Sequence, residues 1–183
     1  NRVMSLLTDF CQDIELYSID EAFLKFDLIS EESLIEKALE IRQKIFQFTG
    51  IPVSIGLART KTLAKLANKI AKKNTGVFLA LGEEKINKIL KKTKIEDLWG
   101  LSFRSKKKLE KLEVFNAYML KKADPEKIRK ALSILGERIC LELSEKQVLD
   151  LESLEDKKSI TSSKSFSHKL KNLEAISEAL ASY

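Results

Sequence analysis

The sequence predicts an α+β protein in which a half built from strands and helices is followed by a purely helical half. Up to about residue 81, short apolar runs suited to strands alternate with amphipathic helical segments. From about residue 85 to about residue 150 only helical periodicity remains, and lysine is dense throughout. This change of pattern places a domain boundary between residues 82 and 92.

Composition limits the function classes. The chain has 183 residues, is 44% hydrophobic and 33% charged, and is therefore large and apolar enough to fold around real cores. Its net charge of +6 suggests a polyanionic partner without naming one. Two distant cysteines without a CxxC motif argue against disulfides and zinc, and predict a reducing cytoplasm. No apolar stretch reaches the roughly 20 residues that span a bilayer, so no membrane partner is expected.

The first half is read from its periodicity. The helix over 31–49 has the clearest pattern, because Ala38, Ile41 and Ile45 repeat at helical spacing after an acidic start, and Gly50 closes it. The expected elements are a helix over 1–13, strands over 14–19 and 22–28, the helix over 31–49, a strand over 51–58, a helix over 61–73 and a strand over 76–81.

The second half reads as short helices and then a new domain. The expected helices are 84–92, 95–98, 104–112, 115–121, 125–134 and 136–143. A polar linker over 143–159 leads to a strand over 160–167 and a helix over 170–183. Because the chain starts with Asn1 and stops within a helical pattern, we expect it to be an internal piece of a longer protein.

Two adjacent acids, Asp20 and Glu21, interrupt an apolar run at the junction of the first two strands. At a tight bend both carboxylates can converge on one point, and convergent carboxylates suit Mg²⁺, which prefers oxygen ligands. The alternative is a plain hairpin turn with solvated acids. The apolar density on both sides favours the metal hypothesis.

Two basic segments predict contact with phosphates. Winding 61–73 as a helix places Lys61, Lys65, Lys69 and Lys72 within about 80° of one another, with no acid in the segment. A merely solubilising face is the alternative. The segment "LWGLSFRSKKKLEKL" (98–112) has a glycine turn that leads into a basic helix start, where backbone N–H groups and lysines can bind phosphate.

Together, "YSIDEAFLKFD", "SIGLARTKTLAKLANKIAKK", "EDLWGLSFRSKKKLEKL" and "SSKSF", in this order, resemble the Y-family DNA polymerases, and most closely their UmuC-type branch. The resemblance runs along the whole chain. It implies a polymerase palm over 1–88 with a mixed sheet and helices, a small all-helical thumb with a helix-hairpin-helix over 89–157, and the start of an α+β little finger over 158–183.

The resemblance also implies roles for individual residues. Asp20 and Glu21 match the metal-binding aspartate and the catalytic glutamate of a two-Mg²⁺ nucleotidyl transfer site. Lys72 matches the palm lysine that contacts the incoming deoxynucleoside triphosphate. The residues matched to DNA-contacting positions are Gly100, Ser102, Arg104, Lys106 and Lys107 in the thumb, and Lys164 and Ser165 at the start of the little finger.

The expected function is template-directed synthesis opposite damaged, primed DNA in the bacterial SOS response. The resemblance also implies UmuD-type subunits, a recombinase filament and a sliding clamp as partners, and a location in the cytoplasm near the nucleoid. Two departures from the family pattern are Ser102, where a second hairpin glycine is usual, and Arg59, where proline is frequent. The competing interpretations are a non-catalytic DNA-binding or regulatory module, and another two-metal phosphoryl-transfer enzyme such as a nuclease.

Overall fold

The computed structural model describes residues 2–27, 30–152, 161, 163, 165, 166, 169 and 172–181. They fall in two compact units, Asn1–Ser153 and Leu154–Tyr183. The second unit contains helix α8 (Leu173–Ala181), within the predicted helix 170–183. The predicted strand 160–167 lies largely outside the described residues, and its four described members belong to no strand. Among the described helices, none has the length and apolar character needed to cross a membrane.

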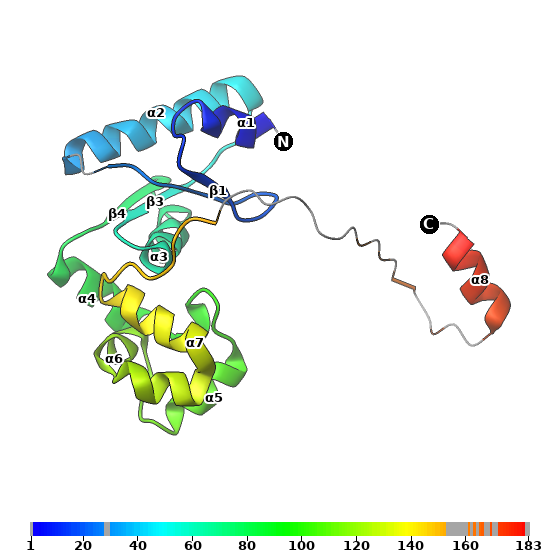
Figure 1. The fold of residues 1–183 in the computed structure, drawn as a ribbon. Helices are drawn as coiled ribbons and strands as arrows, with labels where there is room; N and C mark the ends of the chain where they lie inside the picture. Colours follow the sequence, from blue (N-terminus) through cyan, green and yellow to red (C-terminus); the bar gives the residue numbers. More distant parts are fainter. Residues whose placement is uncertain are drawn as a thin grey trace. The chain divides into compact units, whose positions relative to one another are not determined.

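The first half of unit one is α+β, as predicted. Its elements are α1 (Arg2–Thr8), β1 (Ile14–Leu16), β2 (Ala22–Leu24), α2 (Glu31–Thr49), β3 (Ile55–Ala58), α3 (Lys61–Ala71) and β4 (Val77–Ala80). The first helix ends earlier than the expected residue 13. Helices α1 and α2 lie on one side of the strands and α3 lies on the other (Figure 1).

The sheet differs from the expected single mixed sheet. Within the described residues, β1 and β2 form an antiparallel pair in which Glu15 faces Phe23, and β3 and β4 form a separate parallel pair. Strands β2 and β3 both line a cleft of about 180 Å³. The two pairs therefore flank this cleft instead of joining through hydrogen bonds.

Helix α3 packs closely on β3. A Cβ atom at Gly56 would lie 2.1 Å from the backbone nitrogen of Asn68 and 2.4 Å from the carbonyl oxygen of Ala64, so only glycine fits there. The apolar face of α3, with Leu63 and Leu66, enters a core shared with the helical half. The division of this unit at residue 88 therefore stays a prediction.

The helical half matches the predicted series of short helices. It contains α4 (Glu83–Lys92), the 3₁₀ turn η1 (Ile95–Asp97), α5 (Phe103–Glu110), α6 (Ala117–Lys122) and α7 (Pro125–Leu143). The predicted break between 125–134 and 136–143 appears as a kink inside α7, where Ser133 has φ 71° and ψ −174°.

The fully buried Glu142 of α7 joins the two halves. Its Oε2 accepts a hydrogen bond of 2.9 Å from the backbone N–H of Thr62 at the start of α3. Its Oε1 accepts hydrogen bonds of 3.2 Å from the N–H groups of Val148 and Leu149. The hydroxyl of Thr60 donates to the Glu142 carbonyl oxygen at 3.0 Å. A buried carboxylate with three donors at a helix N-terminus is well compensated.

Replacing Glu142 should therefore cost more stability than replacing an exposed acid. We expect Glu142→Ala to lower the free energy of unfolding by about 3 kcal/mol, because one buried and two partly buried N–H groups lose their acceptor. Urea denaturation followed by circular dichroism measures this change. Glu110→Gln, at an exposed position of α5, is the matched control and should change stability by less than about 0.5 kcal/mol. Equal changes in the free energy of unfolding for both substitutions would contradict the role of Glu142 in joining the two halves.

The two cysteines should differ in reactivity. Burial raises the pKa of Cys140 to about 11, and its Sγ lies 3.0 Å from the carbonyl oxygen of Leu120. Since the thiolate is the reactive form, a thiol reagent at pH 8 should modify only the half-buried Cys11 in the folded chain. Mass spectrometry after labelling, with and without urea, reports the sites. Modification of Cys140 at the same rate as Cys11 in folded protein would refute this expectation.

Candidate functional site

The acidic pair occupies the tight turn that joins β1 to β2. The backbone N–H groups of Tyr17 and Ser18 both donate to the carbonyl oxygen of Glu21 at 3.0 Å, which closes the turn. The exposed carboxylate of Asp20 accepts a 2.8 Å hydrogen bond from the Ser18 hydroxyl. Asp20 and Glu21 both line the cleft next to β2 and β3. The pair thus lies at a sheet end, on a turn, as the sequence suggested.

A lysine from α3 is paired with this turn. Lys65 Nζ lies 2.5 Å from Glu21 Oε1. The same ammonium lies 5.2 Å from the centroid of the Tyr17 ring and 5.9 Å from that of Trp99. The ammonium therefore already compensates one of the two carboxylates that were predicted to hold metal.

The predicted uncompensated lysine stripe on α3 is wrong, because acids from other elements reach it. Lys61 pairs at 2.5 Å with the buried Glu15 of β1, and Lys69 pairs at 2.5 Å with Asp97 of η1. The hydrogen bond from Lys69 lowers the pKa of Asp97. Glu15 also accepts a 2.7 Å hydrogen bond from the N–H of Glu152, near the end of unit one. Most of the stripe therefore serves the packing of α3.

Sequence reasoning missed Glu15, although a signal was available. Glu15 is an acid at the centre of a short strand, and α3 is a later helix with lysines and no acids. This combination favours an ion pair between the strand and the helix. Lys72 is exposed at the C-terminal end of α3, and its role in binding a nucleotide stays a prediction.

The glycine turn before α5 has the geometry of a hairpin. Gly100 has φ +81°, a conformation that other residues rarely adopt. Ser102 caps α5 and forms a capping box with Ser105, so the missing second glycine is replaced by a side-chain cap. Arg104 and Lys107 are exposed in the first turns of α5.

Lys106, expected to grip phosphate, instead lies 3.0 Å from Glu96 of η1. The hydrogen bond to Glu96 raises the pKa of Lys106, and hydrogen bonds from backbone and from Lys106 lower the pKa of Glu96. Arg104 and Lys107 are therefore better placed for an external anion than Lys106. Ser165 is exposed in unit two, and Lys164 lies outside the described residues.

The hairpin and the acidic turn touch each other. The indole Nε1–H of Trp99 donates to the Tyr17 hydroxyl at 3.0 Å, and the two rings meet edge to face at 5.3 Å. Phe23 of β2 packs against both rings, with centroids 5.8 Å from each. Trp99 is thus a structural contact, and it holds the basic hairpin beside the two carboxylates.

The kinked helix α7 lies next to the glycine turn. A Cβ atom at Gly100 would lie 3.3 Å from Ile139 Cδ1 and 3.6 Å from Leu135 Cδ2, just beyond the α7 kink at Ser133. The sequence predicted the break in α7 but not its position beside Gly100. Folding therefore brings the part of α7 that follows the kink against the glycine turn.

The acidic turn offers an incomplete set of metal ligands. Asp20 and Glu21 supply the carboxylate oxygens that a hard divalent cation prefers. In the part of the chain that the structure describes, no three acidic, histidine or cysteine side chains cluster closely enough to hold a metal ion. The donor chemistry of the two carboxylates fits Mg²⁺, which proteins usually hold through one or two carboxylates together with water and substrate phosphates.

Comparison with known proteins agrees with this geometry. Residues 1–69 match the model of the impB/mucB/samB family. Protein UmuC of Salmonella typhimurium is 35% identical over 189 aligned positions, which cover the whole chain but 45% of that relative. DNA polymerase IV of Oceanobacillus iheyensis is 28% identical over 91% of the chain and 40% of its own length. The chain thus spans less than half of these relatives.

A solved structure supports the fold. The insertion ternary complex of Dbh DNA polymerase superimposes with a TM-score of 0.64 at 27% identity, over 79% of this chain and 42% of that one. The comparisons by sequence and by structure therefore identify the same group of relatives for the α+β half and for the helical half. The chain is thus similar over most of its length to Y-family DNA polymerases, and its first 69 residues match the impB/mucB/samB family.

Proposed function

We propose that this chain is the palm and thumb portion of a translesion DNA polymerase that transfers deoxynucleotides to a primer opposite damaged template bases. The observation that carries the proposal is the Tyr17–Trp99 contact. It holds the carboxylates of Asp20 and Glu21 beside the basic hairpin at Gly100. A primer whose backbone lies on the hairpin would have its terminus near the acidic turn.

Asp20 and Glu21 would hold divalent Mg²⁺, which supplies charge stabilisation at the reacting phosphate. The chain's own contribution is positional. Lys65 forms an ion pair with the Glu21 carboxylate and so fixes its position at the cleft. Lys72, exposed at the end of α3, is the candidate contact for the triphosphate.

The cleft between β2 and β3 suits a further strand that carries the third carboxylate. Its lining is largely apolar, and both flanking strands face it. The buried Oδ1 of Asn68 borders the cleft and has no hydrogen-bond partner within the described part of the chain. A backbone N–H of an inserted strand is the natural donor to that oxygen. The relatives are more than twice as long, which leaves ample sequence for such a strand.

The DNA backbone would lie across the glycine turn of the thumb. The start of α5 presents backbone N–H groups there, and Arg104 and Lys107 add exposed cations. We assign Gly100 and Ser102 the same contact through the backbone of their turn. Ser165 and Lys164 would reach DNA from the little finger. UmuD-type subunits, a recombinase filament and a sliding clamp are the proposed protein partners, and the bacterial cytoplasm at the nucleoid is the proposed location.

A non-catalytic DNA-binding module is the second candidate, because only two of the metal-binding carboxylates lie in the described residues. The two candidates share DNA binding and differ in catalysis. Two experiments therefore test them separately.

The first experiment measures binding to duplex DNA as salt is raised. The logarithm of the association constant should fall linearly with the logarithm of salt concentration, with a slope of roughly −0.9 for each phosphate neutralised. Arg104→Ala with Lys107→Ala should weaken binding and flatten the slope by about 0.9 for each phosphate that is no longer neutralised. Lys88→Ala with Lys92→Ala, both exposed on α4, is the matched control. Equal weakening in both double variants would show that binding follows net charge alone.

The second experiment measures primer extension with Mg²⁺ or Mn²⁺. The 183-residue chain should be inactive, because Asp20 and Glu21 leave a two-metal site short of a third carboxylate. A version restored at its N-terminus should extend primers, and Asp20→Asn should abolish this activity while DNA binding persists. Extension by the 183-residue chain that is sensitive to Asp20→Asn would show that the site is complete here. Inactivity of the restored version would favour the binding module.

A further inference from the structure

A hollow of about 440 Å³ in the helical half has no part in the proposed polymerase site. It lies between the loop after α5, helix α6 and the start of α7. Its apolar lining comes from Leu112, Val114, Tyr118, Met119, Ala123 and Ile128. We name it the thumb hollow. Its volume lies in the range of pockets that bind small molecules or anchoring side chains.

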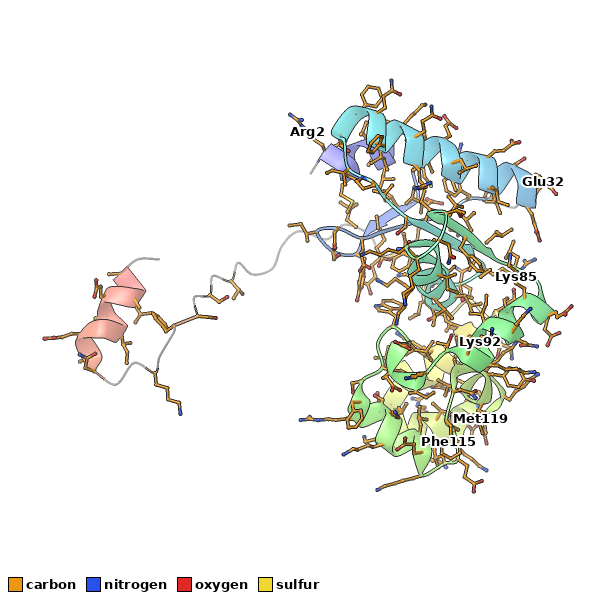
Figure 2. The ribbon with its side chains drawn as sticks, turned by 180° about the vertical axis from the view of Figure 1, so that it is seen from behind. Arg2, Glu32, Lys85, Lys92, Phe115 and Met119 are labelled. Atoms are coloured by element: carbon orange, nitrogen blue, oxygen red, sulfur yellow. The ribbon has the colours of Figure 1, made fainter. Side chains whose placement is uncertain are left out.

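The thumb hollow has a buried floor and an exposed apolar rim. Val114 and Ile128 are buried, whereas Leu112 is 41% exposed and Met119 is 36% exposed. Phe115, next to this lining in sequence, is 58% exposed. Phe115 and Met119 both lie at the lower end of the helical half, on the side away from α2 (Figure 2). Large apolar side chains gathered around a concave surface are typical of a binding site for a protein segment.

The charges around the hollow indicate what kind of segment fits. Lys122 and Lys127 line it, are exposed, and make no ion pair within the described residues. Two acids also line it. Asp124 is engaged as the N-cap of α7, where its Oδ1 accepts the Glu126 N–H at 2.9 Å. Glu113 remains as an exposed acid. The amino end of α7, which begins at Pro125 and is kinked at Ser133, adds positive potential.

We propose that the thumb hollow docks a short segment of a partner protein in which a bulky apolar residue is flanked by aspartate or glutamate. The apolar residue would fill the hollow, and its acidic neighbours would pair with Lys122 and Lys127. DNA fits less well, because its backbone offers no apolar group for the floor formed by Val114 and Ile128. Buried anchors surrounded by a polar rim are the usual arrangement of such contacts.

The test uses the full 183-residue chain and a fluorescein-labelled peptide with one tryptophan flanked by aspartates. Fluorescence anisotropy measures the dissociation constant. Replacing the tryptophan by serine should weaken binding at least about tenfold, since the peptide then has no anchor for the hollow. Lys122→Glu with Lys127→Glu should weaken it by about tenfold as well, and Met119→Ser should weaken it without changing any charge.

Lys88→Glu with Lys92→Glu, on exposed positions of α4 outside the lining of the hollow, makes the same change in net charge. This control should change the affinity by less than about twofold. Circular dichroism verifies folding of each variant. If the charge reversal at the hollow unfolds the chain, Met119→Ser decides.

Three results would overturn the proposal. One is the absence of saturable peptide binding, and another is an equally large decrease of affinity in the α4 control. The third is displacement of the peptide by a short DNA duplex whose own binding is lost in the Lys122→Glu and Lys127→Glu variant but not in the α4 control. That result would assign the hollow to nucleic acid.

Discussion

The buried carboxylate of Glu142 fixes the geometry on which the candidate site depends. It binds the first turn of α3 to the last turn of α7 and to the segment that follows. Helix α3 in turn presents Lys61 to Glu15 and Lys65 to Glu21. Glu142 positions α3 on α7, and α3 in turn positions β1 and the acidic turn. An acid far from the cleft therefore determines where the acidic turn lies relative to the helical half.

The charges of this chain serve two different purposes. Lys61, Lys65 and Lys69 pair with acids of other elements, so they hold α3 in position and contribute little to a field outside the protein. Arg104 and Lys107 remain exposed at the hairpin. The net charge of +6 therefore overstates how strongly α3 attracts anions. The positive charge that remains available to an anion is concentrated at the hairpin of the helical half.

Much of this organisation could be predicted from local patterns. The bounds of α2 follow from its periodicity, its Ser30 cap and Gly50, and all three are encoded within one stretch of sequence. The position of Asp20 and Glu21 on a turn follows equally from adjacent residues. The sequence shows that Glu15 needs a cation, but not which lysine supplies it, because Glu15 and Asp97 lie 46 and 28 residues away from their partners in the chain. The contact of Gly100 with the kinked helix α7 is likewise tertiary, since only folding brings Leu135 to it.

The cleft between the two strand pairs has a consequence for handling this portion of the protein by itself. Strands β2 and β3 border it, and no third strand joins the two pairs within the described residues. Open strand edges next to apolar surface are templates for pairing with another polypeptide. At high concentration, copies of the chain should therefore tend to exchange or add strands with one another. The surface that would accommodate a further strand is thus also a route to self-assembly of the chain.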